Sequence, residues 1–433
     1  MIAAPDLARL AAVGGRHQVV SDQQACRLLA GVLDAVRPRR VLLLPPDFTR
    51  CHSGVGPLTT FIKGYLSGAQ VDILPALGTH APMSRHQIAL MFPGLEPADV
   101  LVHDWRRDPV RLGVVPAQFV RQVSGGRLDY EIEIAVNRRV VEGGYDLILS
   151  LGQVVPHEVA GMANGAKNLF VGVGGADIIN KTHFLGAVCG LEQAMGRAAT
   201  PVRAVFDYAA AQFCRDLPIC YALTVRQRLA DGDLVTRGLF VGNDAQTFGQ
   251  AVALSQEVNL DLLPEPLPNV VVWLDPEEYH STWLGNKAVY RTRLALADGG
   301  RLLVLAPGVA RFGEDPTIDA LIRRHGYRGT PATLAAVESD LELAANLSAA
   351  AHLIHGSSEG RFEITYAPGG LSRAEVESVG YGYGDLATLS ARYDPRRLRD
   401  GLNRLDDGEE VFFIANPALG LWALAQTFDS TPV

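Results

Sequence analysis

A lysine with a histidine on either side stands in a segment of small residues. His157 precedes Lys167 and His183 follows it, and glycine, alanine and asparagine fill many of the positions between them. Only four of the 39 basic residues in the chain are lysines. A lysine amine in apolar surroundings tends to lose its proton and become a nucleophile, whereas a guanidinium stays protonated. The segment therefore favours covalent attachment of a ligand to Lys167.

A metal ion bound near this segment would need ligands from outside the protein. His183 could offer one imidazole nitrogen to a metal, but one histidine and one lysine do not make a complete site. The glycine-rich stretch 172–177, GVGGAD, lacks the GxGxxG spacing of a dinucleotide-binding loop. Most of the ligands of any metal held here would have to come from a cofactor.

Four other polar residues stand just after apolar runs that predict buried strands. They are Asp47, Arg50, His80 and His157, and the runs lie within 39–47, 68–80 and 145–157. Open α/β sheets bind their ligands at the carboxyl ends of their strands. Each residue alone has an ordinary interpretation, such as an Asx turn at Asp47 or a turn histidine. Together they predict one site at one edge of a sheet.

Composition and charge exclude several classes of protein. A chain of 433 residues predicts two or three domains. The net charge of −8 argues against nucleic acid or an acidic membrane surface as the main partner. We see no signal peptide and no apolar run long enough for a membrane helix. The five cysteines form no CxxC pair, which favours a reduced, cytoplasmic protein.

The apolar runs alternate with amphipathic segments, which predicts an α/β fold with parallel strands. The later sequence predicts a hairpin at 220–243 around Asp231-Gly232, a helix at 244–260 capped by Asp244, a linker at 262–268, a strand at 269–275, a helix near 286–298 and a strand at 300–307. We therefore expect two α/β domains, residues 1–264 and 265–433, with an active-site cleft between them.

The order of these polar residues resembles that of the nickel-dependent lactate racemase family. That family has the succession Asp-x-Thr-Arg, Gly-Thr-His, Pro-His, Lys and His. Here it is matched by Asp47-Phe48-Thr49-Arg50, Gly78-Thr79-His80, Pro156-His157, Lys167 and His183. The resemblance covers essentially the whole chain, and five ordered motifs are more specific than any single one.

The resemblance implies a cofactor. It is the nickel-pincer nucleotide, pyridinium-3,5-bisthiocarboxylic acid mononucleotide with nickel, which other proteins must synthesise. By this likeness Lys167 would hold the pincer through a thioamide, and His183 would supply the remaining nickel ligand. Asp47 would lie near the cofactor, together with Arg50.

The resemblance also implies a reaction on a 2-hydroxy acid. His80 and His157 would be the acid/base groups on the two faces of the substrate, and Arg50 would bind its carboxylate. No amino-acid side chain can accept a hydride, so the cofactor would take it from C2 and leave a bound 2-keto acid. Return of the hydride to the opposite face makes the enzyme a racemase or C2-epimerase.

The second domain departs from the family pattern. The family has Tyr-Gln-x-x-Lys at a helix start, and this chain has Tyr290-Arg291-Thr292-Arg293-Leu294. Arg291 and Arg293 are either substrate-binding replacements or solvated helix residues. The polar and aromatic stretch 277–287, which includes Lys287, could line a larger pocket. We therefore expect a sugar acid of the gluconate or mannonate type, with lactate or another short 2-hydroxy acid as the alternative.

Two further classes of function remain open on the sequence. A conventional metal-dependent hydrolase or lyase would need acidic ligands beside His80 and His157, and only Glu158 is adjacent to either. A non-enzymatic nickel-nucleotide carrier would bind the cofactor without inverting a substrate. The presence of two candidate proton-transfer histidines counts against a carrier.

Overall fold

The apolar runs early in the sequence form the middle of a parallel sheet. The computed structural model describes residues 7–229, 232–418 and 420–426. β2 (Arg40–Leu44) lies between β3 (Gln70–Ile73) and β6 (Leu147–Gln153) and is parallel to both. Nearly every residue of β2 and β6 is buried, as expected for a parallel sheet that is covered on both faces.

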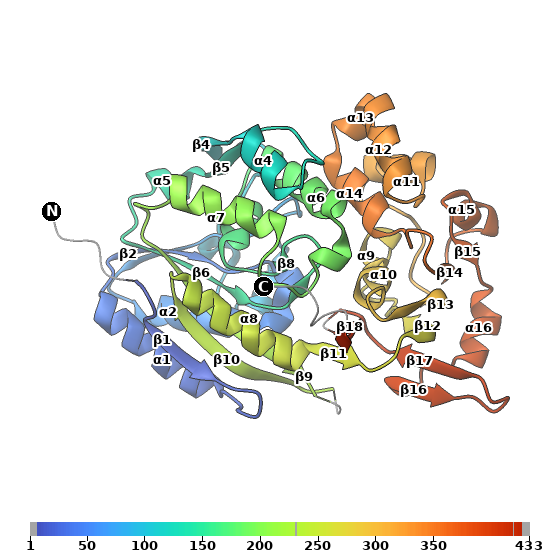
Figure 1. Cartoon of the computed structure of the whole chain (residues 1–433). Coiled ribbons are helices and arrows are strands. Elements are labelled where there is room, and N and C mark those ends of the chain that lie inside the picture. Colours follow the sequence, from blue (N-terminus) through green and yellow to red (C-terminus); the bar gives the residue numbers. More distant parts are fainter. Residues whose placement is uncertain (1–6, 230–231, 419, 427–433) are drawn as a thin grey trace. The chain divides into compact units, whose positions relative to one another are not determined.

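The described chain divides into two units, each built on one six-stranded sheet (Figure 1). Unit 1 is drawn from Met1–Thr182 and Ala194–Asn259, and unit 2 from His183–Gln193 and Leu260–Val433. Both sheets consist mainly of parallel strands, so the prediction of two α/β domains is confirmed. Helix α6 (Ala176–Cys189) begins in unit 1 and ends in unit 2.

The sheet of unit 1 has the strand order β1-β10-β9-β6-β2-β3. β9 (Ile219–Arg228) is parallel to β6, and β10 (Leu234–Gly242) returns antiparallel to β9. The predicted hairpin is therefore confirmed, although Asp231 of its turn lies outside the described residues. β1 (Ala11–Gly14) closes this edge of the sheet antiparallel to β10.

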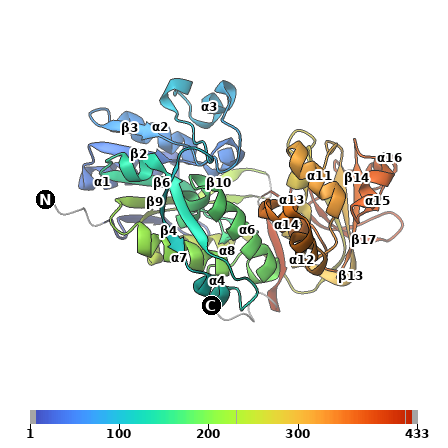
Figure 2. The ribbon, with the colours of Figure 1, turned by 90° about the horizontal axis from the view of Figure 1, so that it is seen from above.

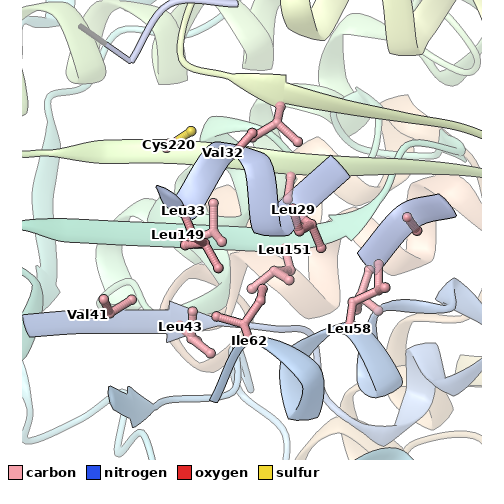
Figure 3. Packing of buried hydrophobic residues seen from close by; sticks show 14 of the residues in the cluster. Leu29, Val32, Leu33, Val41, Leu43, Leu58, Ile62, Leu149, Leu151 and Cys220 are labelled. Carbon is pink, nitrogen blue, oxygen red and sulfur yellow. The ribbon is translucent and has the colours of Figure 1, made fainter. Parts of the chain in front are cut away.

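Apolar side chains of two helices fill one face of this sheet (Figure 3). α1 (Asp22–Val36) contributes Leu29 and Leu33, and α2 (Val55–Tyr65) contributes Ile62. They pack with Leu43 of β2 and Leu149 of β6, and all five side chains are almost fully buried. Burial of each such side chain is worth roughly 1.5–3 kcal/mol, so this layer fixes the strands that carry the candidate site.

The other face of the sheet is covered by α8 (Ala245–Asn259). Successive residues of a strand point to opposite faces. Accordingly Leu239 of β10 packs in the layer with α1, whereas Phe240 packs with Ala251 of α8. Asp244 accepts the backbone N–H of Thr247 at 2.8 Å, which confirms its prediction as the N-cap of this helix.

A two-stranded ribbon lies beside the main sheet of unit 1, with β4 packed against α7 (Figure 2). The bounds of the remaining elements of this part of the chain are η1 Phe48–Ser53, α3 Arg85–Met91, η2 Pro97–Asp99, β4 Pro109–Val115, α4 Ala117–Val123, β5 Ile132–Asn137, α5 Arg138–Glu142, β7 Pro156–His157, β8 Gly161–Met162, η3 Asn168–Gly172, η4 Leu191–Gln193 and α7 Pro201–Phe213.

The sheet of unit 2 has the strand order β15-β14-β13-β12-β17-β16, and only β16 is antiparallel to its neighbour. The bounds of its elements are β11 Leu260–Leu263, β12 Leu267–Trp273, α9 Thr282–Gly285, α10 Lys287–Thr292, β13 Leu296–Ala306, α11 Pro316–His325, α12 Thr330–Ser339, α13 Leu341–Ala344, α14 Leu347–His355, β14 Glu363–Pro368, α15 Arg373–Ser378, β15 Gly382–Tyr383, α16 Leu386–Arg392, β16 Gly401–Arg404, β17 Glu410–Ile414 and β18 Leu421–Leu424.

Two predictions in this region were wrong. The expected linker 262–268 contains the end of β11 and the start of β12, because its leucines find strand partners. The helix expected near 286–298 ends at Thr292, and β13 already begins at Leu296. The strands predicted at 269–275 and 300–307 are confirmed by β12 and β13.

None of the helices in the described ranges is long and apolar enough to cross a bilayer.

Candidate active site

A carboxylate and a histidine meet where β2 and β3 end. Asp47 follows β2 through Pro45 and Pro46, and Pro46 forms a parallel bridge with Ala76, which lies on the segment after β3. His80 lies four residues farther along that segment, and its Nδ1 is 2.7 Å from Asp47 Oδ2. The predicted convergence of these two strand ends is therefore present in the structure.

The surroundings of Asp47 keep it ionised. Burial alone would raise the pKa of this carboxyl group, which is only 6% exposed. The hydrogen bonds with His80 and Thr49 and the charge of Arg50 outweigh burial, so the pKa lies below its ordinary value. The Thr49 hydroxyl donates to Asp47 Oδ1 at 2.6 Å, which fixes the carboxylate plane. His80 itself is more than half exposed.

Lys167 lies immediately before the short π-helical turn η3 and has an unusual environment. Loss of solvation, and then the nearby positive charge of Arg50, lower the pKa of its amine to about 8. Glu158 and Asp47 act in the opposite direction but do not cancel these effects. In the described part of the chain, Lys167 has no hydrogen-bond or ion-pair partner. Lys167 is therefore a cation that deprotonates easily and is not neutralised by a carboxylate.

We expect this amine to react with an acylating reagent at a lower pH than an ordinary lysine. Because its pKa in the folded protein is about 8, roughly half of it is neutral at pH 8, against well under 1% for an unperturbed lysine of pKa about 10.4. Competitive labelling of the cofactor-free protein across pH 6–11, read by peptide mass spectrometry against a lysine peptide standard, measures the midpoint. A midpoint for Lys167 near that of the standard would contradict the assignment.

Arg50 is a second cation without a partner. Its backbone N–H donates to Asp47 O at 3.0 Å, but its guanidinium makes no hydrogen bond or ion pair with any residue that the structure describes. Because Arg50 is close enough to lower the pKa of Lys167, the two cations share one region. Such a region favours an anion, and the fork of a guanidinium matches a carboxylate.

His157 lies on the short hairpin formed by β7 and β8. The ring is buried, with 6% of the side chain exposed, and Glu158 Oε2 lies 3.9 Å from its Nδ1. The same Glu158 acts electrostatically on Lys167, which places the tip of this hairpin in the region of the other candidate residues. The structure thus brings together Asp47, Arg50, His80 and Lys167, with His157 on the adjoining hairpin.

Several residues that position this cluster were not singled out in the sequence. Asn168, directly after Lys167, donates to Leu44 O at 3.0 Å and to Ser150 Oγ at 2.9 Å, which ties η3 to the end of β2 and the middle of β6. Gly172 allows the close approach of Ala76, because a Cβ on Gly172 would come within 2.5 Å of that methyl group. The sequence shows Asn168 as a polar residue at the start of an apolar run, but it does not show its partners, which are 124 and 18 positions away.

Arg203 of α7 supports the loop that leads to Lys167. Its guanidinium donates to Met162 O at 2.6 Å and to Asn164 O at 3.1 Å, and burial lowers its pKa to about 10. Gly165 follows with a φ of +61°, a conformation that glycine adopts without strain. No sequence signal identified Arg203, since an arginine on an amphipathic helix is usually solvated.

His183 lies in the part of α6 that belongs to unit 2, whereas Lys167 belongs to unit 1. Its role as a metal ligand therefore stays a prediction. Within the described residues, no group of three His, Cys, Asp or Glu side chains is arranged to hold a metal ion.

The guanidinium of Arg293 is fully used inside unit 2. Its Nε and Nη2 both lie 2.8 Å from Glu192 Oε1, and Nη1 donates to the carbonyls of His355 and Ser357 at 3.3 and 3.2 Å. Only 2% of the side chain is exposed. This geometry does not support the predicted role of Arg293 in substrate binding. Arg293 instead anchors the segment 183–193, which carries His183.

Arg291 is also buried, with 3% exposure, and donates to Ala418 O at 3.4 Å. Five of the eleven residues in the polar stretch 277–287 are buried, and the other six are exposed or half-buried. Asn286 is fully buried and accepts hydrogen bonds from Tyr366 and Tyr381, and Tyr279 is 1% exposed. These two side chains therefore pack inside unit 2, and the hypothesis that this stretch enlarges the substrate site stays a prediction.

Comparisons with known proteins agree with the motifs. Residues 33–196 match the family model described as the lactate racemase N-terminal domain. A crystal structure of a protein from Thermotoga maritima superposes with a TM-score of 0.80 at 22% identity, over 95% of this chain and 100% of that one.

The structure of the lactate racemase apoprotein from Thermoanaerobacterium thermosaccharolyticum gives a TM-score of 0.66 at 15% identity, over 89% of this chain and 87% of that one. Because the sequence identities are only 22% and 15%, these two similarities show a shared fold. A search of curated proteins gave no match.

Proposed function

We propose that this chain, whose residues 33–196 match the lactate racemase N-terminal domain, is a racemase or C2-epimerase of a 2-hydroxy acid. The proposed cofactor is the nickel-pincer nucleotide, which the proteins of its biosynthesis must supply. The observation that carries the proposal is the pair of unneutralised cations, Arg50 and Lys167, beside the Asp47–His80 hydrogen bond.

The residues of this chain fit the cofactor in two respects. The amine of Lys167 is desolvated and has a pKa of about 8, and Gly165, two residues earlier, is in the left-handed region, which suits covalent attachment. The described residues provide no cluster of three metal ligands, so a nickel ion would take most of its ligands from the nucleotide, with His183 as the proposed protein ligand. When bound, this group supplies the hydride acceptor that side chains lack.

The protein would orient the substrate and exchange its hydroxyl proton. Arg50 would bind the carboxylate, since a charge-assisted hydrogen bond contributes roughly 1.5–3 kcal/mol. Asp47 would hold the His80 ring through Nδ1, which leaves Nε2 to face the hydroxyl group. His157, from the adjoining hairpin, would contact the substrate oxygen as the second histidine.

The finer substrate assignment now depends on fewer residues. In this chain Leu294 occupies the position of the family's lysine. Arg291 and Arg293 were the two residues expected to replace that lysine, and Arg293 pairs with Glu192, so only Arg291 remains for this role. Our proposal remains a longer 2-hydroxy acid of the sugar-acid type. The Arg291 guanidinium would bind the hydroxyl groups of a longer acid. A short acid such as lactate would leave this donor unpaired, which weakens binding.

The test is inversion of C2-deuterated acids by protein co-expressed with the cofactor-making enzymes, followed by chiral chromatography and mass spectrometry. The panel is lactate, malate, longer aliphatic 2-hydroxy acids, gluconate and mannonate. We expect inversion with deuterium kept at C2, because the hydrogen leaves and returns as hydride, and the highest kcat/KM with an aldonate. Exchange of the deuterium with solvent would contradict the hydride route, and lactate as the best substrate would contradict the assignment of chain length.

A further inference from the structure

The glycine-rich segment 172–175 connects two parts of the candidate active site. It begins at the last residue of η3, the turn that directly follows Lys167. Gly172 O accepts the backbone N–H of Gly78 at 2.8 Å, and His80 lies two residues after Gly78. A shift of this segment would therefore change the position of His80 relative to Lys167.

The same segment is attached on its other side to β5. Val173 O accepts the backbone N–H of Asn137 at 2.8 Å, and the N–H of Gly175 donates to Ala135 O at 3.0 Å. The segment thus runs beside the β4–β5 ribbon, which holds it from the side away from His80.

A buried histidine holds the middle of the segment. His103, which lies between η2 and β4, is 3% exposed, and its Nε2 is 3.1 Å from Gly174 O. A carbonyl oxygen can only accept, so Nε2 carries the proton. Gly174 must be a glycine, because a Cβ at this position would lie 1.7 Å from Phe170 O. The backbone at Gly174 is therefore closely packed on one side and hydrogen-bonded by a side chain on the other.

The His103 ring is oriented by Asn137. The backbone N–H of Arg139 donates to Asn137 Oδ1 at 3.0 Å, which fixes the orientation of the amide. Its Nδ2 then donates to Asp108 Oδ2 at 3.2 Å and to His103 Nδ1 at 3.0 Å. Burial lowers the pKa of His103 despite the opposing effects of Gly174 O and Asp108, so the ring is neutral at pH 7.5. The lone pair is on Nδ1, and the proton on Nε2 is directed at Gly174.

We propose that His103 is a positioning residue of the candidate active site, an inference that rests on the proposed function: its Nε2–H fixes Gly174 O, and the segment 172–175 in turn fixes the spacing between His80 and Lys167. This spacing matters because the histidine that exchanges the substrate proton and the lysine that carries the cofactor must be placed around one substrate. A misplacement of about 1 Å can reduce a rate by about 10²-fold.

The wild-type protein provides the first test. In cofactor-free protein labelled with ¹⁵N in its histidines, long-range ¹H–¹⁵N correlation spectra distinguish Nδ1–H, Nε2–H and doubly protonated rings. The signal that disappears in His103→Gln identifies His103. We expect the Nε2–H form at pH 7.5, because only this form satisfies both Gly174 O and the amide of Asn137. Any other form at that pH would overturn the proposal.

Hydrogen exchange tests whether the segment transmits the loss of this bond. His103→Leu removes the donor, so in cofactor-free protein we expect the amide of Gly78 to exchange about tenfold faster than in the wild type. His103→Gln keeps a donor, since the glutamine amide reaches about as far as Nε2, and should exchange like the wild type. If His103→Leu does not fold, His103→Asn replaces it, because the shorter amide cannot reach Gly174 O. An unchanged Gly78 amide in the variant without the donor would overturn the proposal.

Kinetics of the cofactor-loaded variants gives an independent measure. We expect His103→Leu to carry a full adduct on Lys167 and to lose about 10–100-fold in kcat, with KM changed by less than about threefold. His103→Gln should keep most of the wild-type kcat. Equal losses in the two variants would overturn the role of Nε2–H. Loaded wild-type protein that inverts no 2-hydroxy acid would instead contradict the proposed function, and the spectra and the exchange rates would still decide whether His103 holds the segment.

Thr59→Val is the matched control for loss of stability. Thr59 is fully buried in α2, and its hydroxyl donates to Val55 O at 2.9 Å, so this variant also loses a buried hydrogen bond. We expect a lower melting temperature, as in His103→Leu, but wild-type kcat and wild-type exchange of the Gly78 amide. If Thr59→Val lowers kcat as much as His103→Leu does, loss of stability explains both effects and His103 is not a positioning residue.

Discussion

A Lys167→Arg protein, co-expressed with the enzymes that make the nickel-pincer nucleotide, should carry no covalent adduct and should have no detectable inversion activity. Arginine keeps the positive charge, but its guanidinium stays protonated and cannot form the amide-like link. The amine of Lys167, in contrast, has a pKa of about 8 because it is desolvated and lies near Arg50. Intact-mass spectrometry followed by peptide mapping measures the adduct directly.

Lys181→Arg is the matched control. Lys181 lies on α6, where its Nζ pairs with Asp177 at 2.7 Å and donates to Glu131 O at 2.7 Å, so an arginine can keep both contacts. We expect this variant to load and to invert the substrate like the wild type, with a similar melting temperature. An adduct on the Lys167→Arg protein, or an adduct that maps to Lys181, would disprove attachment at Lys167.

The sequence was most informative where a polar residue directly follows a buried strand. Asp47 and His80 were predicted to meet because parallel strands end at the same edge of a sheet, and the structure places them 2.7 Å apart. The prediction succeeded because a buried parallel strand leaves little freedom to the residue that follows it. The same reasoning identified both α/β units, since the apolar runs of parallel strands are nearly continuous.

The sequence was least informative for contacts between distant side chains. The sequence around Arg293 indicates either a substrate-binding arginine or a solvated helix residue, but Arg293 pairs with Glu192, which is 101 positions away. Asn286 likewise seemed to be a pocket residue and is instead buried against two tyrosines. Local periodicity shows which face of an element is apolar, but not which polar side chain will find a partner on another element.

Replacement of Asp47 with asparagine should reduce kcat/KM by about 10²–10⁴ in both directions of the reaction without preventing cofactor loading. The carboxylate accepts from Nδ1 of His80 at 2.7 Å, whereas an amide can turn its NH₂ group toward that nitrogen and favour the tautomer with no lone pair on Nε2. The hydrogen bonds from His80 and Thr49 keep the pKa of Asp47 below its ordinary value, so the residue is ionised across the neutral range. The loss should therefore be the same at pH 6 and pH 8.

Two variants separate this effect from a general loss of charge. Thr49→Val removes only the 2.6 Å hydrogen bond to Asp47 Oδ1 and should cost less than Asp47→Asn, since the carboxylate and its bond to His80 remain. Asp72→Asn removes a carboxylate elsewhere in unit 1, where it accepts from Tyr145 Oη at 2.6 Å, and should leave the kinetics unchanged. If Asp47→Asn is as active as Asp72→Asn, Asp47 does not set the tautomer of His80, and the base must be activated by another group.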